Sequence, residues 1–277
     1  MTNIWRTIKP STRNLRVWQV GLLVFIFVLW HVATKPGLVP PIVFENDQQA
    51  AFFFGEPLKI FSRIWAWFVT NADIYQHLWV TLLETVLAFG IGTVLGLACG
   101  LWLALSPLAA AIADPYIKAA NSMPRVILAP IFAVWFGLGI ASKVALGVTL
   151  VFFIVFFNVY QGVREVSTTV LDNGRMLGMN ERQLTRHVYW PSALSWMFSS
   201  LHTSVGFAVV GAVVGEYLGS AAGLGYLIHQ AEGMFDIAGV FAGMFVLSAF
   251  VILIDVMVTV VERRLLVWRP SAAEGRG

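Results

Sequence analysis

Long apolar runs constrain this chain more than any other feature. A helix that crosses a bilayer needs about 20 mainly apolar residues, because the hydrocarbon core is about 30 Å thick. Lipid offers no partners to backbone N–H and C=O groups, so an apolar span of this kind is helical. Six runs meet or nearly meet that length: Val17–Ala33, Val80–Leu105, Ile112–Phe136, Val144–Gly162, Ser192–Leu218 and Ala238–Val261. We therefore expect an all-α membrane protein with about six transmembrane helices. The first run is longer than the apolar part of a signal peptide, so we expect a retained helix.

The third run is the most interrupted of the six. It contains Lys118, Asn121, Pro124, Arg125 and Pro130. Proline is tolerated in membrane helices where neighbouring groups satisfy the freed backbone. We expect a single span here, kinked at its prolines.

Composition excludes several classes of protein. Of the 277 residues, 58% are hydrophobic and only 12% are charged, which is too little polar surface for a soluble domain of this size. One cysteine, Cys99, rules out a disulfide-built fold. The net charge of +3 comes from short separated clusters rather than one basic face, which argues against nucleic-acid binding.

Lysine and arginine mark the cytoplasmic side of a membrane protein. The N-terminal tail, the segment Gly162–Pro191 and the C-terminal tail each contain four of them. The opposite flanks contain only Lys35, Lys59, Arg63 and Lys143. With six spans the three basic segments share one side, so we expect a multi-pass protein of the cell (inner) membrane, with both termini in the cytoplasm.

The segment Lys35–Gln76, between the first two spans, is too long for a simple turn. Within it, Pro57–Val69 places Ile60, Ile64, Trp67 and Phe68 on one helical face. This pattern is compatible with a helix in the outer membrane interface, or with packing of that face against the other helices.

Small residues recur every four positions in several spans. Gly92, Gly96 and Gly100 form one ladder, Gly211, Gly215, Gly219 and Gly223 a second, and Gly239 and Gly243 a short third. Such ladders let helices approach closely in lipid. We expect tight packing, within the chain or across a dimer, rather than a pore lining.

The polar segment Gly162–Pro191 differs from the rest of the chain. Leu171, Met176, Leu177 and Leu184 recur among charged residues at spacings that fit a helix. Gly178 interrupts the pattern. We predict a short helix, a glycine turn and a second short helix that Pro191 ends before the next span.

This segment resembles the cytoplasmic "EAA" loop of ABC-importer permeases. That pattern reads Glu-Ala-Ala, three residues, Gly, nine residues, then Ile-x-Leu-Pro. The spacing matches with Asp172, Gly178, Val188 and Pro191 at the corresponding positions. Asn173-Gly174 stands in place of Ala-Ala, and Trp190 stands in place of Leu. In the family this loop couples the permease to its ATPase. The resemblance assigns that role to Asp172, Asn173, Gly174, Arg175, Leu177, Gly178, Met179 and Pro191.

Other segments resemble one branch of the same family, the nitrate/sulfonate/taurine/bicarbonate type. They are Met123–Pro130, Trp135–Gly139 with Ser142-Lys143, Gly215–Gly219 with Gly223–Gly225, and Asp255 with Glu262–Arg264. The resemblance covers about Leu78–Trp268. Glu84 departs from it, since members often carry Arg there.

The resemblance implies a type I ABC-importer permease fold. It further implies a second permease chain, commonly identical, two cytoplasmic ATPase subunits and an extracytoplasmic substrate-binding protein. Residues 1–76 would form the N-terminal tail, the first helix and the extracytoplasmic interfacial segment. Residues 77–268 would form the permease core, which includes the coupling loop at 162–191. Residues 269–277 would form a cytoplasmic tail. ATP and Mg would bind the ATPase subunits, and this chain would need no cofactor.

Motifs for catalysis are missing from the sequence. No Gly-Lys dipeptide occurs, so a phosphate-binding loop is absent, and neither His-Glu-x-x-His nor Gly-x-Ser-x-Gly is present. With one cysteine, a Cys-rich metal site is also excluded. We predict a transport subunit without catalytic residues or a metal.

Ionisable side chains within spans are costly and therefore suggest function. Arg125, Asn158, His202 and Glu216 are candidates for a translocation path. The alternative role for Arg125 is that of a structural anchor. The alternative role for His202 and Glu216 is a hydrogen bond between helices, and we expect the same role for Asp255. Glu84, near the outer boundary, is expected to reach water.

Three functions suit a multi-pass membrane protein of this size. The first is an ABC-importer permease that moves a small solute. An anionic solute would suit Arg125, because a guanidinium group binds oxyanions. A stand-alone secondary transporter or channel predicts inverted repeats, which we do not find. A membrane-embedded enzyme lacks its catalytic residues.

Overall fold

The computed structural model describes residues 12–35 and 47–265, and every regular element in these ranges is helical. The elements are α1 (Thr12–Thr34), α2 (Asp47–Phe54), α3 (Pro57–Trp65), α4 (Ile74–Leu105), α5 (Pro107–Ser122), α6 (Leu128–Phe136), α7 (Ile140–Arg164), α8 (Thr168–Met176), α9 (Glu181–Leu184), α10 (Trp190–Leu218), α11 (Leu224–Gly233) and α12 (Ile237–Leu265). Five helices are long and apolar enough to span a membrane, and a bent pair makes up to six. The expected all-α architecture with about six spans is confirmed.

The chain divides into two compact units, which are described separately. One comprises Met1–Ala72 and Ala231–Ala242, and the other comprises Asp73–Gln230 and Gly243–Gly277. The second unit contains most of the long helices.

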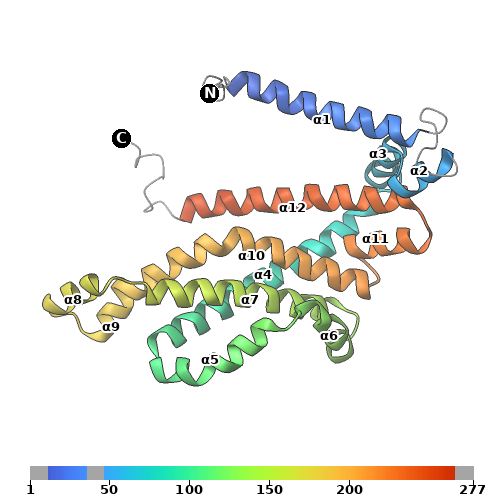
Figure 1. Ribbon diagram of the computed structural model, residues 1–277. Helices are drawn as coiled ribbons and strands as arrows, with labels where there is room; N and C mark the ends of the chain where they lie inside the picture. Colours follow the sequence, from blue (N-terminus) through green and yellow to red (C-terminus); the bar gives the residue numbers. More distant parts are fainter. Residues whose placement is uncertain (1–11, 36–46, 266–277) are drawn as a thin grey trace, which may run out of the picture. The chain divides into compact units, whose positions relative to one another are not determined.

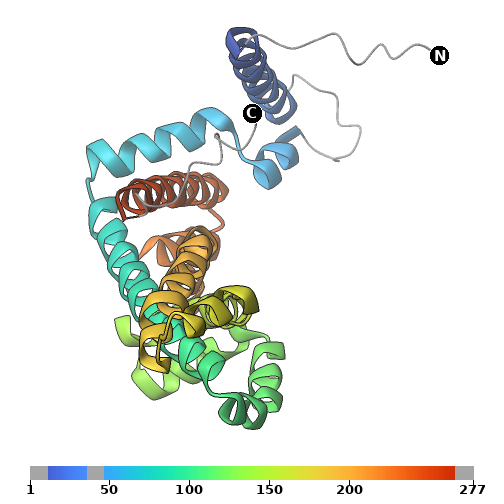
Figure 2. The same ribbon diagram turned by 90° about the vertical axis from the view of Figure 1, so that its left-hand side faces the viewer.

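Three helices, α4, α7 and α10, form the centre of the second unit (Figure 1, Figure 2). The first glycine ladder of α4 faces a valine ladder of α7 with the same spacing. A Cβ atom at Gly92 would lie 2.7 Å from Val151 Cβ, and one at Gly96 would lie 2.8 Å from Val155 Cβ. Glycine is therefore required for this close approach, and the expected tight packing is confirmed within one chain.

The second ladder brings α10 against α7. A Cβ atom at Gly211 would overlap the backbone of Gly147, and one at Gly215 would lie 2.7 Å from Lys143 Cγ. Around these contacts lies an apolar core, in which Ala88 of α4, Val159 of α7 and Ala208 of α10 are fully buried. The second unit is thus held by backbone-close helix packing.

The third apolar run is interrupted more sharply than the kink that we predicted, and it forms two helices. Helices α5 and α6 are bent by 79° at a short break that contains a 3₁₀ turn, Arg125–Ile127. Met123 and Pro124 are extended, with ψ angles of 130° and 102°. Proline disfavours helical geometry in the residue before it, which explains why the helix ends rather than kinks.

In the other unit, α3 continues through a π-helical segment, Ala66–Thr70, so that Pro57–Val69 is helical as predicted. On the predicted face, Ile60 and Trp67 are buried and Ile64 and Phe68 are half-buried. This supports the packing alternative for that face. Arg63 pairs with Asp236 at 2.5 Å, which ties this helix to the turn before α12.

Candidate functional site

The predicted coupling loop folds into two short helices, α8 and α9, that meet at a glycine turn. Gly178 has a φ angle of +82°, in the left-handed region that glycine accepts most easily. Its N–H donates to Arg175 O at 2.9 Å, and the N–H of Met179 donates to Gly174 O at 3.0 Å. These two bonds form a Schellman motif, which satisfies the last carbonyls of α8.

The second helix begins with a capping box that the sequence analysis missed. Asn180 Oδ1 accepts from the N–H of Gln183, and Gln183 Oε1 accepts from the N–H of Asn180, both at 2.9 Å. The spacing Asn-x-x-Gln after a glycine was the signal that could have revealed it.

The two helices pack on each other through a small residue. Gly174 is buried, and a Cβ atom there would lie 2.9 Å from Leu184 Cδ2. Leu184 is completely buried. Arg175 lies 3.6 Å from Asp172 and 3.5 Å from Glu181, so it bridges the two helices electrostatically. The buried contact between Gly174 and Leu184, more than these exposed ion pairs, therefore holds the two helices together.

Two large apolar side chains project from the tip of this element. Met176 is 86% exposed and Leu177 is 81% exposed, whereas Leu171 of the same pattern is half-buried. Figure 1 shows α8 and α9 at the end of α7 and α10 that lies away from α6. A rigid element with an exposed apolar tip has the properties of a docking surface for another protein.

Pro191 does not end the second short helix, contrary to our prediction. Residues Glu181–Leu218 form one long helix. A π-helical segment, Thr185–Tyr189, precedes the proline, and the N–H of Trp190 donates to Thr185 O, five residues back. Because proline lacks an N–H and its ring crowds the preceding turn, the wider π turn lets the helix continue.

Arg125, the first of the four candidates for a translocation path, lies at the break between α5 and α6. Its guanidinium carbon is 4.5 Å from the centre of the Phe153 ring, and its terminal nitrogen donates to the side chain of Asn121. Its Nε atom is buried without a hydrogen-bond partner in the described chain. The guanidinium thus keeps unused donor capacity.

The other candidates have separate partners. Asn158 donates to Ile154 O of its own helix at 2.8 Å. His202 lies between two carboxylates of α12, with Nδ1 2.8 Å from Asp255 and Nε2 2.9 Å from Glu262. The bond between helices that we expected of His202 and Asp255 is therefore present.

Glu216 is buried and binds the start of α11. Its Oε1 accepts from Thr81 Oγ1 at 2.6 Å, and its Oε2 accepts from the N–H of Gly225 at 2.8 Å. Thr81 Oγ1 in turn accepts from the N–H of Leu224 at 2.9 Å. The carboxylate acts as a cap for α11, supplied by another helix.

Glu84 and Lys143 join Glu216 in this buried cluster. Glu84 is only 1% exposed, so the prediction that it reaches water is wrong. Lys143, which we counted among the outer flanks, is 2% exposed and donates to Leu138 O. Their positions along the helices gave no indication that both side chains point inward. Glu84 Oε2 is buried without a hydrogen-bond partner among the described residues.

Comparison with known proteins identifies the family. The model of the "Binding-protein-dependent transport system inner membrane component" family matches residues 92–267. The chain is 35% identical to the formylaminopyrimidine transport permease ThiX of Halalkalibacterium halodurans, over 88% of this chain and 92% of the relative. It is 29% identical to the putative aliphatic sulfonates transport permease SsuC of Bacillus subtilis, over 98% and 95% of the two chains. It is 26% identical to the taurine transport permease TauC of Escherichia coli, over 95% and 93%.

Solved structures agree on the fold. A chain of the MetNI methionine ABC transporter in an inward facing conformation matches with a TM-score of 0.61 and 20% identity, over 69% of this chain and 95% of that chain. The predicted type I importer fold is confirmed, and the alternatives of a lone secondary transporter and of an enzyme are set aside. The chain belongs to the binding-protein-dependent inner membrane components: it is a multi-pass permease of an ATP-driven ABC importer, which works with ATPase and binding-protein partners and itself catalyses no reaction.

Proposed function

We propose that the α8–α9 element, defined as residues 168–184, receives the ATPase and passes its movement into the membrane helices. The observation that carries this proposal is the exposed apolar tip, Met176 and Leu177, on an element fixed by a Schellman motif and a capping box. A rigid element transmits displacement, whereas a flexible loop would absorb it. Asp172, Asn173, Arg175 and Met179 then form the surroundings of the tip.

Co-purification tests this docking surface. Leu177→Glu places a charge in the apolar contact and should abolish retention of the ATPase subunit by the detergent-solubilised permease. Thr168→Glu is the matched control, because it adds the same charge to the first turn of α8, where a negative charge stabilises the helix. Retention by the Leu177 variant at the level of wild type would overturn the proposal.

The transported solute, we further propose, is small and carries an anionic group. Arg125 supports this, because its guanidinium lies over the Phe153 ring and its buried Nε has no partner among the described residues, at a break in the membrane helices. The names of the relatives SsuC and TauC, which refer to sulfonates and taurine, point the same way. Asn158, His202 and Glu216 have structural partners, so Arg125 remains the strongest candidate for contact with the solute.

The full assembly that we propose has two identical copies of this permease, two ATPase subunits bearing ATP and Mg, and one extracytoplasmic binding protein. Both termini would lie in the cytoplasm. The orientation rests on the basic residues of the sequence; those of the tails at 1–11 and 266–277 lie outside the described residues. Mass measurement of the purified complex tests the stoichiometry, and an odd number of permease chains would contradict it.

A further inference from the structure

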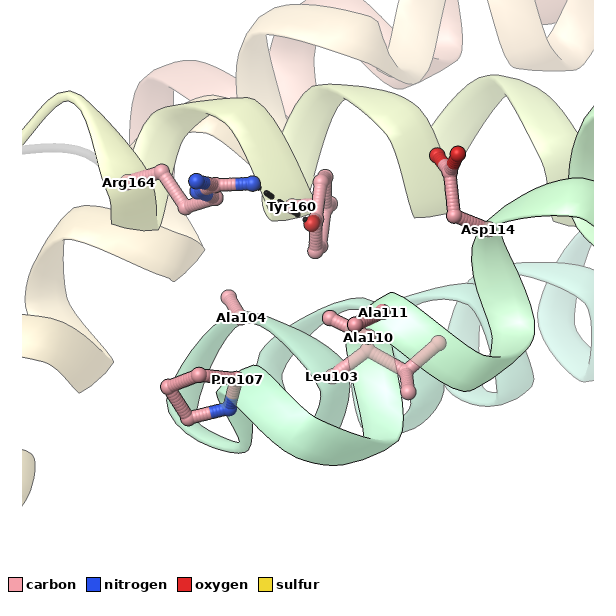
Figure 3. A pocket seen from close by; sticks show the side chains of 8 residues that line it. All are labelled: Leu103, Ala104, Pro107, Ala110, Ala111, Asp114, Tyr160 and Arg164. Atoms are coloured by element: carbon pink, nitrogen blue, oxygen red, sulfur yellow. Dashed lines mark hydrogen bonds between the residues drawn. The ribbon is translucent and has the colours of Figure 1, made fainter.

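A cavity of about 430 Å³ lies between α4, α5 and α7, at the ends of α4 and α7 nearest the α8–α9 element. Figure 3 shows Tyr160 and Arg164 on the α7 side, facing small side chains of α4 and α5. Leu103, Ala104, Ala110 and Ala111 line the apolar part. Asp114 lies at one end of the cavity and Arg164 at the other.

The two charged residues are each held by a partner on their own helix. Arg164 donates to the hydroxyl of Tyr160 at 2.7 Å, and Asp114 accepts from Lys118 at 2.7 Å. Among the ion pairs of the described residues, none joins Asp114 to Arg164. The pair with Lys118 is exposed, and such pairs contribute little stability, so a ligand can compete for Asp114.

This distribution of charge selects a class of ligand. A guanidinium has five N–H donors in a planar fork that suits an oxyanion, and only one donor bond of Arg164 is given to Tyr160. A simple anion would also meet the Asp114 carboxylate, and a simple cation would meet Arg164. A ligand with an anionic group at one end and an ammonium group at the other satisfies both.

We propose that this cavity binds a small zwitterion, its oxyanion on Arg164, its ammonium on Asp114 and its short carbon linker over the alanines. The ligand would connect α5 to α7. Because α7 leads directly into α8, the bound ligand restrains the base of the proposed docking element. The same chemistry could come from a free amino acid or from the ethanolamine headgroup of a phospholipid in the adjacent leaflet.

Equilibrium dialysis of the purified full-length chain in detergent tests the site without any ATPase or binding protein, so its outcome is independent of the proposed coupling role. The probes are glycine, β-alanine and γ-aminobutyrate, which vary the linker, with propionate and ethylamine as singly charged controls. We expect saturable binding of at least one zwitterion and of neither control.

Three variants assign the ends of the ligand. Arg164→Gln and Asp114→Asn should each weaken binding by about tenfold or more, since each removes a charge-assisted hydrogen bond. Lys118→Gln should tighten binding roughly two- to fivefold, because it releases Asp114 from an exposed pair. That gain cannot result from misfolding. Arg186→Gln, at an exposed arginine outside the α8–α9 element, is the control and should bind as wild type does.

Nanodiscs distinguish the two sources. If the phosphatidylethanolamine headgroup occupies the cavity, free zwitterions should bind in phosphatidylcholine discs but not in phosphatidylethanolamine discs. Native mass spectra should then show less phosphatidylethanolamine bound to the Asp114→Asn variant than to wild type. If the ligand is a free solute, its affinity should be equal in both discs. Absence of saturable zwitterion binding together with no lipid preference would overturn the proposal, as would binding that neither Arg164→Gln nor Asp114→Asn weakens.

Discussion

The turn at Gly178 offers the sharpest test of how the α8–α9 element works. Its φ angle is +82°, and a Cβ atom added there would meet no other atom of the described chain within 4 Å. A substitution therefore acts through backbone strain and not through a clash. A left-handed conformation costs an ordinary L-residue about 1–2 kcal/mol, and a β-branched residue more, whereas asparagine adopts it with little penalty.

These values predict different effects for Gly178→Val and Gly178→Asn. At about 2–3 kcal/mol, the valine variant should lower the population of the correct turn roughly 30- to 150-fold relative to alternatives. The asparagine variant should retain most of the population of the correct turn. We expect solute uptake by proteoliposomes, and stimulation of ATP hydrolysis by the binding protein, to fall in that order: wild type, asparagine, valine.

Two results would refute this reasoning. Normal uptake by Gly178→Val would show that the geometry of the turn is unimportant for coupling. Equal loss in the valine and asparagine variants would show that side-chain volume matters, and hence that Gly178 touches the ATPase directly. Circular dichroism should confirm that both variants keep wild-type helix content.

Four further outcomes are expected. Arg125→Ala should reduce uptake by about tenfold or more, since it removes one charged contact with the solute. Arg125→Lys keeps the positive charge and should retain part of the uptake. Pull-down assays should show that both variants still assemble with the ATPase. Glu216→Ala leaves the buried N–H of Gly225 without its acceptor, whereas Thr81 can still donate to His77 O, and should lower the free energy of unfolding by about 1–3 kcal/mol, measurable as a lower thermal midpoint. Gly96→Leu should prevent α4 from packing on α7 and abolish the monodisperse peak in size-exclusion chromatography. Cysteine labelling should reach Lys35–Gln76 only from outside and Gly162–Pro191 only from inside; the reverse would contradict the orientation.

Much of the fold follows from local sequence. Apolar run length predicted the spans, and the Gly92, Gly96 and Gly100 ladder predicted close packing, because both depend on spacing alone. The glycine turn at Gly178 was predicted for the same reason.

The remaining features depend on tertiary contacts. Whether Glu84 and Lys143 point inward depends on how α4 and α7 are rotated against their neighbours, which the positions of charges along a helix do not determine. Pro191 was expected to stop a helix, yet a π turn accommodates it. The 79° bend between α5 and α6 arises from two successive extended residues, where one proline alone would have produced a kink.

The continuity of α9 with α10 gives the coupling proposal its mechanical basis. Residues Glu181–Leu218 form one helix, which at 1.5 Å per residue is about 57 Å long. One end forms the α8–α9 element, and the other carries Glu216, which caps α11. Tight glycine contacts with α7 at Gly211 and Gly215 hold the end near Glu216, and the π segment beside Pro191 interrupts the regular hydrogen bonding near the other end. We expect displacement of α9 to be either absorbed at the π segment, which directly follows α9, or transmitted to the start of α11. The stiffness of that segment would then determine how much movement reaches the far end.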